Sequence, residues 1–500
     1  MVVVEEEDWF VLEQKEEERL AEERRQRRKR KLAQYNNTNT NITTQNEADV
    51  QPKVVEEVVQ VNTRNENDKT EEKEDGNDSF DMFSSSPIPT KNDTTSTTTT
   101  TTVTGDVAVV MMEQQETRNK DDVANFDDEE GYYKAHIGQT LTMTNNSEYK
   151  VMGIIGKGVF STVLKCKDQT HQQQQVVAMK VIRNKEPMAK AALNIEIPLL
   201  QKLVGKHHLV QYIHHVHDYH GHVAIVLQYQ PFTLRHVLNK FGGIAFLAVK
   251  SYFYQLLQAL KQLQQLHIVH ADIKPDNILL SESYSTLYLA DFGSAYIHTN
   301  NNNNNSPPTP YLVSRFYRAP EIIMGIHHHP TTSSSHECVV HQLDLWSVAI
   351  TVAELFCGSV LIPGTSNNDM LYRMMSIFQK PFPKTMIRRH LSNLQPQPQY
   401  HFASQPPHFF QHVRIDKVSG QNVMDIIPHV PTSNQNNKEF HQLIMSAKSP
   451  KDDYGQVIQL IQLLQTCFTF DPTKRITIQQ ALSHPFFTTT TTTQTTTTTK

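Results

Sequence analysis

The chain has 500 residues, of which 38% are hydrophobic and 20% are charged, and its formal net charge is −5. So small a charge argues against binding to nucleic acid or membranes through a global field, and the sequence lacks the apolar run of about eighteen residues that a membrane-spanning helix requires. The acids after Val4 argue against a secretory signal, and the four cysteines lack metal-ligand spacing, which is typical of a reducing compartment. We therefore expect a soluble chain that is not secreted.

Residues 1–35 are dense in Glu, Arg and Lys, with acids leading and bases trailing, which predicts a solvated charged helix. Within it, the stretch 24–31 holds seven basic residues in eight. Such a cluster is typical of a nuclear-import signal or of a patch that contacts RNA, and a plain charged helix face is the alternative. Residues 36–129 are rich in Thr and Asn with a weak β-like run over 54–61. We expect this region to be disordered rather than a small folded domain, because it carries too little apolar surface to offset the entropy of ordering.

A change in composition near residue 130 marks a folded domain, expected over 130–487 and followed by a Thr tail over 488–500. A strand over 149–155 leads into a turn with two glycines and then a second strand. Gly156 and Gly158 would let backbone amides approach phosphate oxygens, while Phe160 covers the site from water. This pattern alone also fits an ordinary tight hairpin.

A strand over 177–180 ends in a lysine, and a helical stretch that contains Glu196 follows. A paired lysine and glutamate can hold the α- and β-phosphates of ATP. Glu196 is preferred to Glu186 as the partner because apolar residues that would anchor the helix follow it. The buried strand expected over 222–228 leads into a polar connector whose backbone would bond the adenine. The residues predicted to bind ATP are Gly156, Lys157, Gly158, Val159, Phe160, Ser161, Val163, Ala178, Lys180, Glu196, Gln228 and Gln230.

Two carboxylates, an amide and a lysine lie close together between residues 270 and 293. Phosphoryl transfer needs a hydroxyl aimed in line at the γ-phosphate and cations over the developing charge. Asp272 would orient the substrate hydroxyl, and Lys274 would neutralise a γ-phosphate oxygen. Asn277 and Asp291 are hard oxygen ligands suited to Mg²⁺. Their spacing, with a short apolar hairpin before Asp-Phe-Gly, is that of a protein-kinase catalytic loop.

The segment 309–321 follows an Asn-rich insert and ends in Ala-Pro-Glu, which is typical of an activation segment. Ala271 stands where many kinases carry an arginine that pairs with a phosphorylated loop residue. Arg315 and Arg318 could instead bind a phosphate on Tyr311, and an unmodified tyrosine is the alternative.

Three further residues are expected to have structural roles. Asp344, in an apolar helix, could brace the backbone of the catalytic loop, and Arg475 could pair with Glu321. A His-rich run over 327–341, with Cys338, has the ligand types of a zinc site. Its irregular spacing and Ser/Thr filler favour a low-complexity loop.

From about residue 130 to 487 the chain resembles eukaryotic protein kinases of the group that holds the cyclin-dependent, MAP and dual-specificity tyrosine-regulated kinases. Within that group it looks most like the spliceosomal pre-mRNA-processing kinases of the Prp-four type. The serine in the glycine loop, the alanine before Asp272 and the Thr-Pro-Tyr segment carry the finer assignment. The motifs that carry the resemblance lie at 131–138, 156–161, 270–277, 291–295 and 309–321.

The resemblance implies an α+β, two-lobed kinase fold, with a small β-rich N-lobe over about 149–230 and a large helical C-lobe over about 231–487. It implies ATP and Mg²⁺ as cofactors, serine and threonine residues of splicing factors as substrates, a nuclear location and autophosphorylation of Tyr311. The resemblance places Arg315 and Arg318 in the substrate-binding turn, where Arg318 beside Tyr317 suggests that proline is tolerated or preferred after the target residue. We also expect a monomeric catalytic domain, no membrane association, and contact with ribonucleoprotein through the basic N-terminus.

Two other functions fit the same sequence. One is a different kinase of the group, similar to the dual-specificity tyrosine-regulated or SR-protein kinases, that acts in the cytoplasm. The other is a pseudokinase scaffold that binds ribonucleoprotein. The scaffold is disfavoured because every residue that the chemistry requires is present.

Overall fold

The computed structural model describes residues 126–144, 146–170, 174–298, 313–326, 340–392, 401–415, 421–428 and 439–488. The predicted charged helix, the basic cluster, most of the Thr/Asn-rich region, the Thr tail after Thr488, Tyr311 and most of the His-rich run lie outside the described residues. The first described residue is Phe126, four residues before the expected start of the domain.

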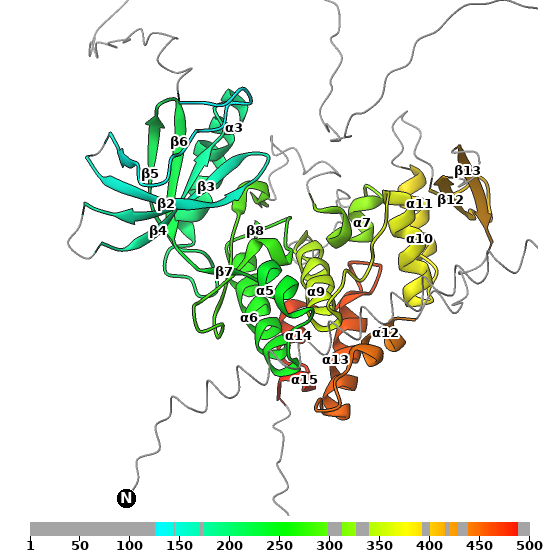
Figure 1. Cartoon of the computed structure of the whole chain (residues 1–500). Coiled ribbons are helices and arrows are strands. Elements are labelled where there is room, and N and C mark those ends of the chain that lie inside the picture. Colours follow the sequence, from blue (N-terminus) through cyan, green and yellow to red (C-terminus); the bar gives the residue numbers. More distant parts are fainter. Residues whose placement is uncertain are drawn as a thin grey trace, which may run out of the picture. The chain divides into compact units, whose positions relative to one another are not determined.

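A six-stranded antiparallel sheet, in the order β1-β2-β3-β4-β6-β5, forms the N-terminal part of the domain (Figure 1). β2 alternates between buried and exposed residues in its first half, as expected of a strand with one face on a core. Two irregularities in its pairing with β3 lie just before the glycine turn. The strands are β1 (Thr140–Thr142), β2 (Glu148–Lys157), β3 (Ser161–Asp168), β4 (Val176–Ile182), β5 (Tyr212–Tyr219) and β6 (His222–Gln228).

Three consecutive helical segments follow β4: α3 (Glu186–Ala191), the π-helix η1 (Ala192–Glu196) and α4 (Ile197–Lys202). None of the residues of α3 is buried, whereas α4 buries Ile197, Leu199 and Leu200. The apolar residues after Glu196 therefore anchor this helix, as the sequence predicted. The wide turn of η1 ends at Glu196, which is itself buried.

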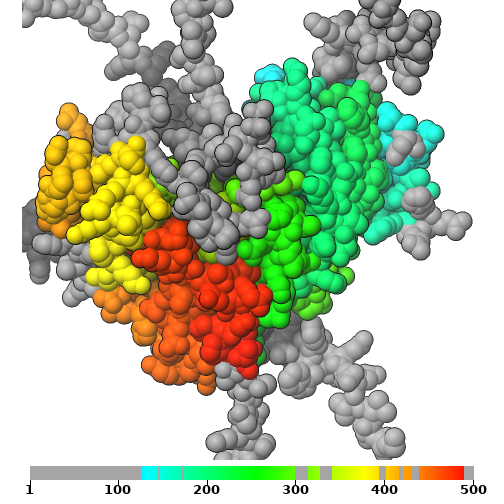
Figure 2. Space-filling model, turned by 180° about the vertical axis from the view of Figure 1, so that it is seen from behind, coloured from blue at the N-terminus to red at the C-terminus, as the bar shows by residue number. Residues whose placement is uncertain are grey.

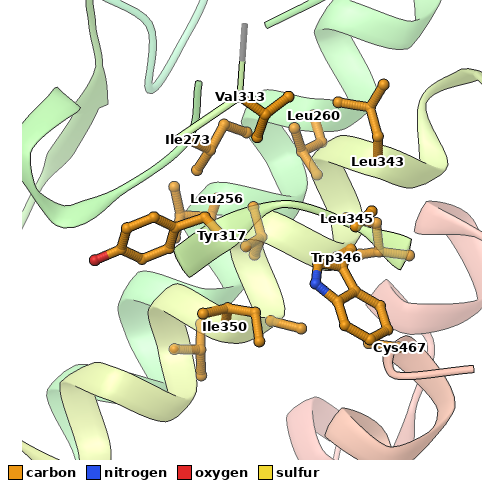
Figure 3. Packing of buried hydrophobic residues seen from close by; sticks show 14 of the residues in the cluster. Leu256, Leu260, Ile273, Val313, Tyr317, Leu343, Leu345, Trp346, Ile350 and Cys467 are labelled. Atoms are coloured by element: carbon orange, nitrogen blue, oxygen red, sulfur yellow. The ribbon is translucent and has the colours of Figure 1, made fainter. Parts of the chain in front are cut away.

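The C-terminal part is helical and is built around α9 (Gln342–Cys357), which is buried along its whole length except at Cys357. Most of its residues are apolar, as expected of a helix in the middle of a core, but it also buries charged residues such as Asp344 and Glu354. Figure 3 shows Leu345, Trp346 and Ile350 of α9 among side chains of neighbouring elements. The other helices are α5 (Leu234–Phe241), α6 (Phe246–Gln265), α7 (Pro320–Ile323), α10 (Asn367–Phe378), α11 (Lys384–Ser392), α12 (Phe440–Ala447), α13 (Tyr454–Cys467), α14 (Ile478–Leu482) and α15 (Pro485–Thr488).

The end of the described chain returns to the start of this helical part. Phe486 packs edge-on against Phe246 at a ring-centroid distance of 6.0 Å, and the red C-terminal surface lies beside the green surface of the earlier helices in Figure 2. No helix among the described ranges combines the length and the apolar character that crossing a membrane would need.

Short strands and 3-10 turns lie in the segments between the helices. The predicted apolar hairpin between the catalytic loop and Asp-Phe-Gly is confirmed as the pair β9 and β10. The strands are β7 (Phe232–Thr233), β8 (Ile268–Val269), β9 (Ile278–Leu280), β10 (Leu287–Leu289), β11 (Tyr296–Ile297), β12 (Phe410–Ile415) and β13 (Asn422–Ile427), and the turns are η2 (Pro275–Asn277), η3 (Phe292–Ser294) and η4 (Arg315–Tyr317). A β-rich N-terminal part and a helical C-terminal part make the expected α+β class.

Candidate active site

Lys180 is the point at which three elements of the site meet. It lies in β4 with 7% of its surface exposed, and its Nζ donates to Glu196 Oε1 at 2.6 Å and to Asp291 Oδ1 at 2.9 Å. Burial by itself lowers the pKa of Lys180, but the carboxylates of Asp291 and Glu196 raise it above its ordinary value. The charged lysine therefore ties the sheet to the helix and to the Asp-Phe-Gly segment.

Glu186, the alternative partner, lies elsewhere. Its carboxylate pairs with Lys190 one turn further along α3, and both side chains are exposed. The structure brings Glu196 to Lys180, and Glu186 takes no part in the cluster.

Asp291 is held in a strained backbone conformation, two residues before Gly293. Its φ is +63°, in the left-handed region that non-glycine residues rarely adopt. A β-carbon added to Gly293 would lie 3.4 Å from Asp291 Oδ1 and 3.5 Å from Lys180 Nζ, in ordinary van der Waals contact with the ion pair. The Lys180 ammonium lowers the pKa of Asp291 to about 2, which keeps the carboxylate ionised.

The Asp272 carboxylate is bonded on both oxygens. Lys274 Nζ donates to Oδ2 at 2.8 Å and Asn277 Nδ2 donates to the same oxygen at 3.0 Å. Ser314 Oγ donates to Oδ1 at 2.6 Å, and Lys274 Nζ also donates to Ser314 Oγ at 2.9 Å. Three side chains therefore fix the direction of the Asp272 carboxylate.

Ser314 is the residue of this cluster that the sequence analysis missed. It lies 42 residues after Asp272 in the chain, so no local spacing joins the two. The available signal was a hydroxyl residue directly before the Arg-Phe-Tyr of the turn η4. Serine has both a donor and an acceptor, and here it uses them on Asp272 and Lys274.

Asp344 braces the catalytic loop, as predicted. It is 1% exposed, and its two carboxylate oxygens accept the backbone N–H of His270 at 2.8 Å and of Ala271 at 2.9 Å. Ala271 has a φ of +62°, so these bonds hold a left-handed residue directly before Asp272.

The predicted pair of Arg475 and Glu321 is also confirmed as a structural contact. Arg475 donates to both carboxylate oxygens of Glu321, at 2.7 and 2.9 Å, and both residues are 3% exposed. This bidentate pair anchors the Ala-Pro-Glu end of the activation segment.

The predicted Mg²⁺ ligands Asn277 and Asp291 have oxygen atoms of the kind that the ion prefers. Asn277 uses its amide nitrogen on Asp272, which leaves the amide oxygen as its ligand atom for a cation. The Asp291 carboxylate is half exposed and bonds Lys180 through Oδ1, so Oδ2 is the candidate ligand atom of this residue. Among the described residues, no group of three or more His, Cys, Asp or Glu side chains is arranged to hold a metal ion, and most of the His-rich run lies outside them.

The glycine turn between β2 and β3 carries several of the predicted ATP-binding residues at its tip. Val159 and Phe160 are 58% and 52% exposed, whereas Ser161 is buried. Lys157 directs its Nζ to Asp128 Oδ2, 3.2 Å away. The remaining predicted residues lie in the sheet, Val163 in β3 and Ala178 in β4.

The connector after β6 is the place expected for the adenine. The backbone N–H of Gln228 donates to Gln211 O at 2.9 Å. This bond engages the backbone N–H of Gln228 within the protein, and the backbone of Gln230 stays a predicted partner for the base.

The two arginines of the predicted substrate-binding turn differ in environment. Arg318 is 5% exposed, and its guanidinium donates to Val313 O at 2.6 and 3.0 Å and to Asn367 Oδ1 at 2.6 Å. Arg315 is exposed and donates to Thr365 O at 2.7 Å. Arg315 is thus the more accessible of the two to a phosphate.

A second network, which the sequence analysis also missed, supports this turn. Arg235 of α5 donates to Glu354 Oε1 at 2.7 Å, to the Tyr317 hydroxyl at 2.7 Å and to Asp276 Oδ2 at 3.1 Å. The Tyr317 hydroxyl donates to Glu354 Oε2 at 2.6 Å, and burial raises the pKa of Tyr317. The network joins α5, η2, η4 and α9 through four side chains.

Three comparisons with known proteins bear on this site. Residues 149–487 match the model of the protein kinase domain. Serine/threonine-protein kinase prpf4B of Dictyostelium discoideum is 34% identical over 421 residues, which cover 81% of this chain and 47% of that protein. Serine/threonine-protein kinase prp4 of Schizosaccharomyces pombe is 35% identical over 382 residues, 73% of this chain and 70% of that protein.

A third relative, dual specificity protein kinase YAK1 of Saccharomyces cerevisiae, is 30% identical over 392 residues, 73% of this chain and 45% of that protein. This chain therefore spans about half the length of the Dictyostelium and budding-yeast relatives.

Proposed function

Because this chain belongs to the protein kinase family, we propose that it transfers the γ-phosphate of ATP to serine and threonine hydroxyls of proteins. The predicted identification as a serine/threonine protein kinase similar to the Prp-four type is confirmed at the level of the family. The predicted fold class, with a β-rich N-lobe and a helical C-lobe, is confirmed as well.

The observation that carries the proposal is a pair of ion clusters joined by a backbone hydrogen bond. Lys180 is bonded to Glu196 and Asp291, and Asp272 is bonded to Lys274, Asn277 and Ser314. The backbone of Ala290, next to Asp291, donates to Asn277 O at 2.9 Å and so joins the two clusters. Preorganised charges of this kind supply the electrostatic stabilisation on which phosphoryl transfer depends.

In the proposed reaction the substrate hydroxyl lies against the Asp272 carboxylate. Its oxygen forms a bond to the γ-phosphorus while the bond from that phosphorus to the bridging oxygen breaks, and ADP leaves. The hydroxyl proton passes to Asp272, whose direction is set by Lys274 and Ser314. Lys274 then stands beside the transferred group and offsets its negative charge.

On the nucleotide side, Lys180 would meet the α- and β-phosphates, with Glu196 fixing its position. Asn277 and Asp291 would hold Mg²⁺, which when bound neutralises phosphate oxygens. The exposed Phe160 and the backbone of the glycine turn would cover the phosphates.

We also propose the finer role that the resemblance implies: phosphorylation of splicing factors in the nucleus, with autophosphorylation of Tyr311. The likeness to prp4 supports it, as does the basic stretch 24–31. A kinase of the dual-specificity tyrosine-regulated kind, acting in the cytoplasm, is the second candidate, and the match to YAK1 favours it. Deleting residues 24–31 separates the two, because a nuclear enzyme addressed by this stretch should move to the cytoplasm.

The proposed activity is tested by transfer of labelled phosphate from Mg-ATP with the full chain, followed by mass spectrometry of the peptide that contains Tyr311. Asp272→Asn should abolish transfer, while Asp425→Asn, which alters an exposed carboxylate paired with Arg414 on the β12–β13 hairpin, should not change it. An Asp272→Asn protein that transfers as fast as the wild type would overturn the mechanism. A wild-type chain that binds Mg-ATP but transfers nothing to itself or to protein substrates would favour the scaffold.

A further inference from the structure

Residues 126–135, here called the strap, run along the sheet just before β1 and are firmly attached to it. Asp127 Oδ1 lies 2.6 Å from Nε2 of His222, whose side chain is fully buried, and Asp127 Oδ2 accepts from Asn184 Nδ2 at 2.8 Å. Gly131 O accepts from the backbone N–H of Asn184 at 2.8 Å. Phe126 stacks on His220 with ring centroids 3.9 Å apart. The strap is therefore part of the domain rather than a linker into it.

Two adjacent tyrosines of the strap point to different surroundings. Tyr133 belongs to the apolar core of the sheet and its hydroxyl lies 3.3 Å from that of Tyr219. Tyr132 is also buried, and its hydroxyl donates to Val159 O at 3.0 Å. Val159 is at the tip of the glycine turn, so Tyr132 links the strap directly to the loop proposed to cover the phosphates of ATP.

A second link joins the strap to the same loop. Lys157 Nζ lies 3.2 Å from Asp128 Oδ2 and 4.2 Å from the centroid of the Tyr132 ring. The guanidinium of Arg183 lies 4.6 Å from that centroid. A cation near an aromatic face is attracted by the ring quadrupole, so Tyr132 binds two cations through its ring as well as Val159 through its hydroxyl.

The turn of the strap is shaped by the carboxylate that binds Lys157. Asp128 Oδ1 accepts the backbone N–H of Tyr132 at 2.9 Å and of Glu130 at 3.1 Å. The bond from Tyr132 is the main reason that the pKa of Asp128 lies below its ordinary value. One oxygen of Asp128 thus orders the strap while the other holds the loop.

We propose that the strap positions the glycine turn for ATP, with Tyr132 and Asp128 as the positioning residues. This inference rests on the proposed function, because the turn is taken to cover the nucleotide. The tip residues Val159 and Phe160 are exposed. The backbone bond from Gly158 N to Ser161 O closes the turn on itself, and the backbone N–H of Arg183, just after β4, donates to Phe160 O at 2.9 Å. The contacts from Tyr132 and Asp128 add a restraint on the other side of the tip, at Val159 and Lys157.

Lys157 then has a role other than the ATP binding that its place between two glycines predicts. The ammonium of Lys157 lies beside Asp128 and Tyr132, so Lys157 connects the loop to the strap. Loss of the strap contacts leaves the turn in several positions, and the binding of ATP must then select one of them. ATP affinity should fall while the transfer step, carried by Asp272, changes little.

The test uses the full chain with Tyr132→Phe, which keeps the ring and removes the hydroxyl. Tyr133→Phe is the matched control, because it removes a hydroxyl from the neighbouring strap residue away from the turn. Since one hydrogen bond contributes a factor of about 2 to 12 to an equilibrium, Tyr132→Phe should raise KM for ATP and the Kd for Mg-ATP by about three- to tenfold, with kcat changed less than about twofold. Exchange of the backbone amide hydrogens at 157–161 should be faster in Tyr132→Phe than in the wild type and unchanged in Tyr133→Phe.

Asp128→Asn and Lys157→Met, singly and together, test the second link. If both side chains act through the strap, each single variant should weaken ATP binding by a similar factor. The double variant should then weaken it by no more than either single variant. The proposal is overturned if Tyr132→Phe leaves the Kd for ATP unchanged, if Tyr133→Phe weakens it equally, or if Lys157→Met weakens it regardless of Asp128. Because the Kd is measured by calorimetry without transfer, an inactive wild type would count against the proposed function and leave this test intact.

Discussion

Replacing Asp344 with asparagine should lower the stability of the domain and its turnover together. Asp344 is 1% exposed, and its two oxygens accept the backbone N–H groups of His270 and Ala271. Asparagine keeps one side-chain oxygen as an acceptor, but its NH₂ group would face the second backbone N–H. That backbone N–H would then lose its acceptor.

The magnitude follows from the bond that is lost. A hydrogen bond to a charged group contributes about 1.5–3 kcal/mol, and a buried donor left without a partner costs about 1–3 kcal/mol. Burial raises the pKa of Asp344, so desolvation already offsets part of the gain from these bonds. We therefore expect the free energy of unfolding to fall by about 2–4 kcal/mol. Because Ala271 holds a φ of +62° next to Asp272, kcat should fall as well.

Urea unfolding gives the stability, and kcat is measured at saturating ATP well below the melting temperature. The exposed Asp425→Asn serves as the control, with no expected change in either quantity. A variant that loses stability but keeps the wild-type kcat would refute the idea that the brace positions Asp272. A variant with unchanged stability would refute the hydrogen-bond argument itself.

Three other perturbations probe the ion pairs of the domain. Glu196→Gln should lower kcat/KM for ATP at least about tenfold, since it removes the charge facing the buried lysine. Glu186→Gln, on the exposed face of α3, should leave kcat/KM unchanged. Equal effects of the two substitutions would contradict the assignment of Glu196 as the partner of Lys180. Glu321→Gln should lower the free energy of unfolding by about 3 kcal/mol or more, because Arg475 remains buried without a full counter-charge, and an unchanged urea midpoint would disprove this. The pKa of Asp291 is lowered from 3.8 to about 2, so the folded state favours its ionised form; that contribution is present above about pH 4 and is lost as the pH falls towards 2. Asp291→Asn should therefore make stability less dependent on pH between about 4 and 3, and an unaltered slope would count against the ion pair.

Local sequence patterns predicted the elements whose residues are neighbours in the chain. The strand that ends near Lys180, the helix anchored by residues after Glu196 and the apolar helix with Asp344 all depend on spacing over a few residues, where burial imposes a period. The pairings of Lys180 with Glu196 and of Arg475 with Glu321 came from the motif order, since their separations of 16 and 154 residues carry no periodic signal.

Contacts made by tertiary folding alone could not be predicted in this way. Arg235 reaches Glu354 across 119 residues, and nothing in the sequence around either residue indicates the other. Lys157 was assigned to ATP from its place between two glycines, but the folded chain puts an aspartate and a tyrosine of the preceding segment beside it. Such contacts depend on where whole elements lie in space, which local propensity does not determine.

The π-helix η1 amounts to one residue inserted into an otherwise continuous α-helix. An extra residue turns everything before it by about 100° relative to everything after it. Because α4 is fixed by its buried leucines while α3 has only partly buried residues, Met188 and Ala189, against the core, α3 is the part whose orientation would change. Deleting one residue from 192–195 would therefore change which side of α3 faces solvent while Glu196 keeps its place, so the length of this short segment sets the orientation of one helix independently of the other.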